Sequence, residues 1–125
     1  MPKPIRITAG SVIVEAELND SPTAAAIQSA LPIEAVARLW GDEIYFPIAV
    51  EQKLDDTAAE VVAVGDLGYW PSGRAFCIFF GPTPASRGDE IRPASAVNLV
   101  GKIVGDAKLF KIVEEGELVR IEKLS

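Results

Sequence analysis

Apolar and polar residues alternate in two short runs near the start of the chain. Every second residue is apolar in residues 5–9 and again in residues 12–18, and Gly10-Ser11 stands between the two runs. A period of two places the apolar side chains on one face of a strand, and a glycine-containing dipeptide allows the tight turn of a hairpin. These residues predict an antiparallel hairpin with one buried face.

The apolar period changes after this hairpin. Ser21 is a residue type that caps helices, and Pro22 is a type favoured at the first helical position. The apolar residues that follow are spaced for one face of a helix until Pro32, which stops it. We expect a helix over about residues 22–31 whose inward face consists of Ala24, Ile27, Ala30 and Leu31.

Short apolar runs punctuated by single glycines and prolines follow this helix. Such punctuation is typical of many short strands joined by turns. A long irregular loop is predicted over residues 81–94, and loops of that length in compact domains are often functional. Asp106 is placed to cap a second short helix, with Leu109, Phe110 and Val113 pointing inward. The predicted strands are residues 33–40, 43–46, 61–64, 67–70, 75–80, 97–104 and 118–123.

This pattern gives about eight strands and two short helices. We therefore expect one domain spanning residues 1–125, a mostly β protein whose strands close into an eight-stranded barrel. Side chains just fill the interior of a barrel of this size. Ligand binding is accordingly expected on the outer surface or in the loops.

The predicted strand at residues 75–80 is apolar on both faces. Phe76, Ile78 and Phe80 point to one side, and Cys77 and Phe79 point to the other. One of these faces must belong to the core. The other is either covered by a helix or forms an exposed apolar surface for a ligand or a second copy of the chain.

Charge and composition limit the partners that are expected. The chain has 12 basic and 18 acidic residues, and the basic ones are spread singly, so neither nucleic acid nor an anionic membrane is an expected partner. The longest uncharged stretches, residues 21–33 and 75–86, are shorter than the ~20 apolar residues that a membrane helix needs. With one cysteine and no signal-peptide pattern at residues 1–4, we expect a soluble, acidic protein of the cytoplasm.

The absence of histidine excludes several kinds of chemistry. A Ser-His-Asp or Cys-His nucleophile and a zinc site built from cysteine and histidine both need an imidazole. Cys77 lies in an apolar strand without a neighbouring cation, which favours a structural role. The acidic clusters do not follow a calcium-loop spacing, and Gly65, Gly68 and Gly73 do not form a dinucleotide fingerprint. We expect neither metal nor cofactor.

Four motifs carry a resemblance to a known family: Leu31-Pro32-Ile33, Trp40–Phe46, Gly65–Gly73 and Phe79–Pro84. In this order they resemble the small, functionally uncharacterised bacterial and archaeal proteins of cyclophilin-like fold. The aromatic strand at residues 75–80 with the loop after it is also similar to a wall of the substrate groove in cyclophilins, the barrel-shaped peptidyl-prolyl isomerases. The resemblance implies a cyclophilin-like barrel with a ligand groove on its outer face.

The catalytic motifs of true cyclophilins are missing from the chain. Isomerisation in those enzymes relies on a Phe-His-Arg segment and a Met-Ile-Gln segment. This chain has no histidine, and its two glutamines, Gln28 and Gln52, do not lie in a matching motif. Arg38 follows the first helix in about the order of the catalytic arginine, although its neighbours differ from that motif. Arg38 is therefore a weak candidate for catalysis.

Our leading hypothesis is a binding module that accepts an extended peptide or a small apolar ligand in an outer aromatic groove. Peptidyl-prolyl isomerisation and a plain homodimerising structural domain are the alternatives. Asp42 in its Gly-Asp turn also suits a structural role, and the aromatic pair Tyr69-Trp70 either covers a sheet edge or forms a ligand platform. The candidate binding residues are Trp40, Glu43, Tyr45, Tyr69, Trp70, Phe79, Thr83 and Arg87.

Overall fold

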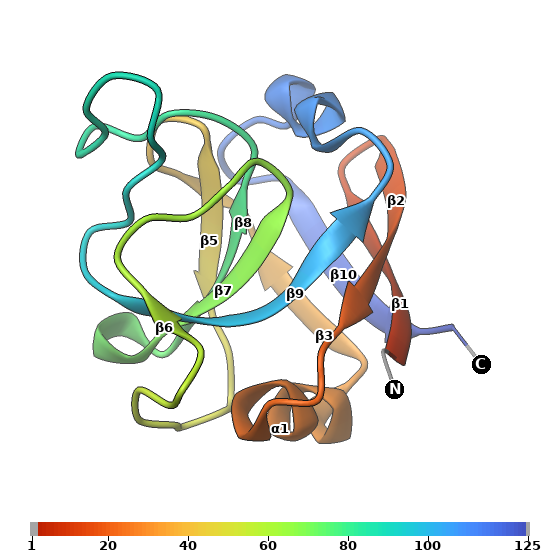
Figure 1. Ribbon diagram of the computed structural model, residues 1–125. Helices are drawn as coiled ribbons and strands as arrows, with labels where there is room; N and C mark the ends of the chain where they lie inside the picture. The colour runs from red at the N-terminus through yellow and green to blue at the C-terminus, as the bar shows by residue number, and fades with distance from the viewer. Residues whose placement is uncertain (1–2, 125) are drawn as a thin grey trace.

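A computed structural model describes residues 3–124, and within them ten strands form one curved sheet (Figure 1). Helix α1 and the 3-10 helix η2 lie at opposite ends of this sheet (Figure 1). The strands are β1 (Lys3–Ala9), β2 (Val12–Leu18), β3 (Ile33–Val36), β4 (Arg38–Leu39), β5 (Glu43–Pro47), β6 (Ala58–Ala59), β7 (Asp66–Trp70), β8 (Ala75–Phe79), β9 (Val97–Val104) and β10 (Leu118–Lys123). The helices are α1 (Pro22–Ala30) and the 3-10 helices η1 (Pro71–Gly73) and η2 (Ala107–Ile112).

The predicted hairpin is confirmed by strands β1 and β2. They pair antiparallel with Ala9 opposite Val12, and Gly10 takes a φ of +57° at the turn, which glycine adopts without a Cβ penalty. The apolar residues of β2 are buried at every second position and the residues between them are exposed. The alternation of apolar and polar residues therefore determines which face of the hairpin packs into the core.

Helix α1 is confirmed and is nine residues long. The Ser21 hydroxyl accepts a hydrogen bond from the backbone N–H of Ala24 at 3.2 Å, which satisfies one of the free donors of the first turn. Ala24 and Ile27 are buried, whereas the last residue of the predicted face, Leu31, caps the helix and is half-buried.

The sheet differs from the closed eight-stranded barrel that the sequence predicts. Its strands follow the order β3-β10-β1-β2-β9-β7-β8-β5-β4, with β6 paired to β9, and within residues 3–124 no ladder joins β3 to β4. These two end strands come from one segment, residues 33–39, that bends at Ala37. The N–H and C=O of Ala37 both bond to residues 116–117 beside β10, and the segment then passes from β10 to β5, its partner at Arg38 and Leu39.

The predicted strand at residues 61–64 is wrong. Val62 forms only an isolated bridge to Ile91, and the short strand in this region is instead β6, where Ala58 pairs with Asn98. The reason is that β9 offers a pairing partner to residues 58–59, and a two-residue strand leaves no alternating pattern to detect.

Both faces of strand β8 are buried, against two different clusters. The inner face, with Phe76 and Ile78, joins the main core, where Phe76 and Phe46 stack at 5.6 Å between ring centroids. The outer face, with Cys77 and Phe79, joins a smaller cluster. Its cover is not a helix: it consists mainly of Val62 and Ile91 from irregular segments and of Val97 at the start of β9.

The second predicted helix is present as the 3-10 helix η2. Asp106 caps it by accepting a hydrogen bond from the N–H of Lys108 at 2.9 Å. Phe110 and Val113 are buried as expected, but Leu109 is 49% exposed, which corrects its predicted inward orientation. With three residues per turn, Phe110 and Val113 share a face and Leu109 does not. Among residues 3–124 no helix is long and apolar enough to span a membrane.

Candidate functional site

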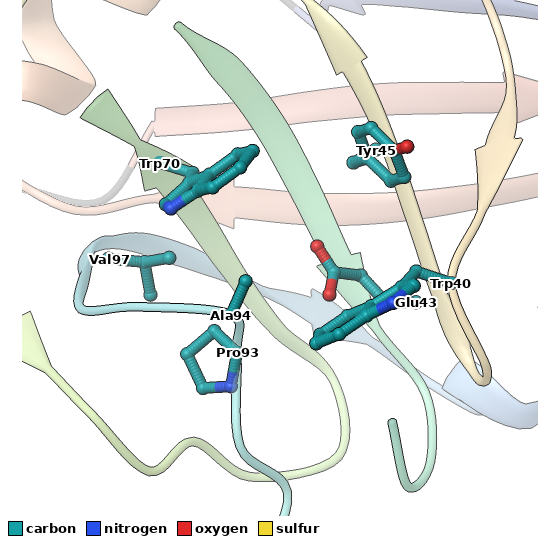
Figure 2. Close-up of a pocket in the computed structure, with 7 residues that line it drawn as sticks. All are labelled: Trp40, Glu43, Tyr45, Trp70, Pro93, Ala94 and Val97. Carbon is teal, nitrogen blue, oxygen red and sulfur yellow. The ribbon is translucent and has the colours of Figure 1, made fainter. Parts of the chain in front are cut away.

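A pocket of about 210 Å³ opens on the outer face of the sheet, over strands β5, β7 and β8 (Figure 2). One wall comes from residues 40–45 and the other from β7 and the chain segment that leads into β9. The residues that line it are Trp40, Glu43, Tyr45, Trp70, Pro93, Ala94 and Val97.

The first wall is placed by the alternation of strand β5. Ile44 and Phe46 belong to the main core, so Glu43 and Tyr45 point to the opposite, outer face. Trp40 joins them because its N–H donates to the carbonyl of Glu43 at 2.9 Å, which closes a tight turn. Residues directly opposite each other at such a turn project to the same side of the ladder.

Packing against the loop that follows β8 holds this turn in place. Gly41 has a φ of +61°, and a Cβ there would lie 2.9 Å from the Cα of Thr83. The N–H of Asp42 donates to the carbonyl of Pro82 at 2.8 Å, and its carboxyl group lies 3.9 Å from Nζ of Lys111. Asp42 thus has a structural role in the turn, while its neighbour Glu43 faces the pocket.

The opposite wall is built around the indole ring of Trp70. Its Nε1–H donates to the hydroxyl of Ser95 at 2.6 Å. Gly73 lies beneath the ring, where a Cβ would come within 2.7 Å of two ring carbons. The glycine therefore lets the ring lie directly on the backbone of η1, and the bond to Ser95 fixes its edge.

Glu43 is the one acidic residue among those that line the pocket, and it is almost completely buried, with 5% of its surface exposed. Figure 2 shows its carboxyl group pointing into the space between the rings of Trp40, Tyr45 and Trp70. Within residues 3–124, its Oε1 atom has no hydrogen-bond partner. Leaving a buried polar atom unpaired costs free energy, so a partner supplied by a ligand would be stabilising.

The apolar surroundings change the acidity of this carboxyl group. Burial raises the pKa of Glu43 to about 7, and the Cys77 thiol on the neighbouring strand opposes part of that rise. A carboxyl group with such a pKa holds a proton about half of the time at neutral pH. Glu43 can therefore either accept a hydrogen bond as the anion or donate one as the acid.

Beneath the pocket, Cys77 and Phe79 are fully buried with Gly68 beside them. A Cβ on Gly68 would lie 3.0 Å from Cγ2 of Val97 and 3.1 Å from Cε2 of Phe79, so this close packing depends on the glycine. Burial, followed by the charge of Glu43, raises the pKa of the Cys77 thiol well above its usual value. The thiol is accordingly held in its unreactive protonated form.

A family model described as cyclophilin-like matches residues 3–122, nearly the whole chain. The chain belongs to the cyclophilin-like family. Among solved structures, this cyclophilin-like protein is similar to the hypothetical protein AF2241 from Archaeoglobus fulgidus, with 44% sequence identity and a TM-score of 0.84 over 98% of this chain and 95% of the other. No curated protein matches the chain.

Four of the candidate residues of this cyclophilin-like protein come together in the pocket: Trp40, Glu43, Tyr45 and Trp70. Phe79 lies in the outer cluster beneath them rather than on the pocket surface. Tyr69 points the other way, into the main core, and its hydroxyl donates to the carbonyl of Val50 at 2.6 Å. Because successive residues of β7 alternate, the outward position of Trp70 forces Tyr69 inward.

The remaining candidates lie outside the pocket lining. Thr83 is buried, and its hydroxyl donates to the carbonyl of Arg92, so it holds the loop together. Arg87 is exposed, and its backbone carbonyl accepts a hydrogen bond from the N–H of Glu90 at 3.3 Å. Arg38 is also exposed, but it is the cross-strand partner of Tyr45 and therefore projects from the same face of the sheet.

Sequence reasoning missed three residues of the lining: Pro93, Ala94 and Val97. They come from the end of the predicted loop and the start of β9, and the one available signal was the length of that loop. As for metals, the described part of the chain brings together no group of three or more cysteine and carboxylate side chains that could hold an ion.

Proposed function

We propose that this cyclophilin-like protein is a binding module whose outer pocket accepts one side chain of an extended peptide, or a small ligand of similar size. What carries this proposal is the buried carboxyl group of Glu43 between three aromatic rings, whose Oε1 atom has no hydrogen-bond partner among the described residues. Ligand sites are typically concave and mostly apolar, with a few polar groups that fix the orientation of the ligand.

The size of the pocket limits what can enter it. Sites for drug-sized molecules usually have about 300–1,000 Å³, whereas a cavity of about 150 Å³ can hold a benzene molecule. At about 210 Å³ this pocket has room for one ring or one branched group. A longer ligand would have to run on across the outer surface, which is how a groove would bind an extended peptide.

The half-exposed side chains of Trp40, Tyr45 and Trp70 supply the apolar contact area. Tryptophan and tyrosine are enriched among residues that dominate binding energies, because they bury a large area at a small entropic cost. We therefore assign affinity to the rings and orientation to Glu43.

Nuclear magnetic resonance of the full chain tests the proposal. A panel of short peptides and single-ring fragments is titrated into isotope-labelled protein, and we expect shifts confined to the pocket residues. Trp40→Ala and Trp70→Ala should weaken binding at least tenfold, whereas Leu118→Ala, which removes a side chain that is 74% exposed elsewhere on the sheet, should not. Shifts centred away from the pocket, or unchanged affinity in both tryptophan variants, would overturn the proposal.

Peptidyl-prolyl isomerisation is a second candidate function, favoured by the position of Arg38. Its guanidinium projects from the same face of the sheet as Tyr45, beside the pocket. An arginine that hydrogen-bonds the proline amide nitrogen would weaken the partial double bond, whose rotational barrier is ~20 kcal/mol. A protease-coupled assay with several Xaa-Pro peptides should then show acceleration that Arg38→Ala removes and Arg87→Ala leaves intact. No acceleration above background would eliminate this function.

A further inference from the structure

The residues that line the pocket carry charge of one sign only. Among the seven lining residues there is one carboxyl group, that of Glu43, and no lysine or arginine. Its Oε1 atom is buried without a hydrogen-bond partner among the described residues. When this carboxyl group is ionised it only accepts hydrogen bonds, so the group that completes the site in that state offers a hydrogen-bond donor, a positive charge, or both.

The aromatic residues of the pocket favour a positive charge. Figure 2 shows the rings of Trp40, Tyr45 and Trp70 arranged around the carboxyl group of Glu43. The face of an aromatic ring carries partial negative charge and attracts ammonium and guanidinium groups within about 6 Å. The three rings and the ionised carboxyl group would therefore each attract a cation that enters the pocket.

We infer that the group bound in this pocket is an organic cation, an ammonium or guanidinium group, held by the carboxylate of Glu43 and by the faces of the three rings. This inference rests on the proposed binding function and names the chemistry of its ligand. A neutral apolar group would fill the space but leave Oε1 of Glu43 unpaired, and a neutral donor would gain little from the rings.

Choline and its neutral isostere 3,3-dimethylbutanol test the inference, because they have the same shape and differ in charge. Both are titrated into the full chain at pH 8, where Glu43 is mostly ionised. We expect choline to bind at least about tenfold more tightly than the isostere. A cation–π contact of moderate strength changes a dissociation constant by about this factor.

The variant Glu43→Gln keeps the size of the side chain and removes its charge. It should reduce the preference for choline to the share that the rings supply and leave the affinity for the neutral isostere within about twofold. The matched control is Asp89→Asn, which removes one negative charge from an exposed loop position and should change neither affinity. A choline preference that Glu43→Gln leaves undiminished, or that Asp89→Asn removes, would contradict the assignment to Glu43.

A pH titration of the unaltered protein gives an independent readout should Glu43→Gln fail to fold. Between pH 6 and pH 8 the ionised fraction of Glu43 rises about tenfold, and choline affinity should rise with it, while that of the isostere stays constant. The other titratable groups on this face are Cys77 on β8 and Tyr45 on β5, with Arg38 beside the latter on β4. A choline affinity that is independent of pH would overturn the inference.

The cation could belong to a peptide side chain or to a free amine, and short peptides that contain lysine, trimethyl-lysine or acetyl-lysine distinguish these two sources. Tighter binding of the cationic peptides than of choline indicates a peptide-borne group, and the reverse indicates a free amine. The acetylated peptide, whose side chain is neutral, should have the lowest affinity of the three peptides. An affinity equal to that of the cationic peptides would overturn the inference. If the isostere binds as tightly as choline, the inference of a cationic ligand is wrong but the proposed binding function is unaffected. If none of the probes binds, including the peptide panel, both the inference and the proposed binding function are wrong.

Discussion

Glu43 and Cys77 lie diagonally across the β5–β8 ladder on its outer face, since Glu43 pairs with Phe79 and Cys77 pairs with Tyr45. Both side chains are buried, and burial raises the pKa of each. The charge of Glu43 raises the pKa of the thiol further. The apolar surroundings therefore favour the neutral, protonated form of both the Glu43 carboxyl group and the Cys77 thiol.

The first prediction concerns stability and pH. The folded state keeps the Glu43 proton up to a pKa of about 7, whereas the unfolded chain releases it near 4.5. Because the folded state binds more protons between these values, the free energy of unfolding should fall as pH rises through this window, by about 3 kcal/mol in total. Urea denaturation at several pH values measures it. In Glu43→Gln this component of the slope should vanish, and an identical slope in both proteins would refute the prediction.

The second prediction is that Cys77 resists thiol reagents in the folded protein. The thiol is buried and its pKa is raised, so neither access nor the reactive thiolate is available. Labelling with Ellman's reagent at pH 8 should be slow and should become complete within seconds in denaturant. Fast labelling of the folded chain would show that the outer cluster opens readily.

The third prediction concerns the glycine beneath Trp70. In Gly73→Ala the new methyl group would come within 2.7 Å of the indole ring and displace it from the pocket wall. We expect a changed tryptophan fluorescence spectrum and at least tenfold weaker binding of whichever probe the pocket takes, with little loss of stability. Ser72→Ala, at the exposed neighbouring position, is the control and should leave both unchanged.

The fourth prediction concerns a buried polar network around Asn98, the residue that follows the pocket residue Val97 at the start of β9. The side chain of Asn98 accepts a hydrogen bond from the N–H of Asp55 at 2.8 Å and donates to the hydroxyl of Thr23 and the carbonyl of Lys53, both at 2.9 Å. Asn98→Ala would leave these groups unpaired and should cost about 2–4 kcal/mol in the free energy of unfolding. A loss below about 1 kcal/mol in chemical denaturation would mean that water replaces the amide.

Local signals in the sequence were sufficient for the first part of the fold. The β1–β2 hairpin and α1 follow from an alternating pattern, a turn glycine and the Ser21-Pro22 cap, all of which act within a few residues. Strand β6 and the bend at Ala37 depend instead on partners distant in the chain, Asn98 and residues 116–117. No local pattern specifies such pairings.

The candidate site was half predictable for the same reason. Trp40, Glu43 and Tyr45 share one short segment, and an acidic residue between aromatics is visible in the sequence. Which of Tyr69 and Trp70 faces outward is decided by the register of β7 against β8, where Trp70 pairs with Ala75. A shift of one residue would exchange the two rings, and composition cannot distinguish the registers.

The bend at Ala37 also bears on how the protein behaves among other chains. An unpaired strand edge offers free N–H and C=O groups on which a second chain can add a strand. Here the two end strands have only four and two residues, and they are consecutive parts of one segment whose middle residue, Ala37, already has its N–H and its C=O bonded to residues 116–117. The sheet therefore presents little edge for strand addition, which protects the folded protein from edge-to-edge aggregation.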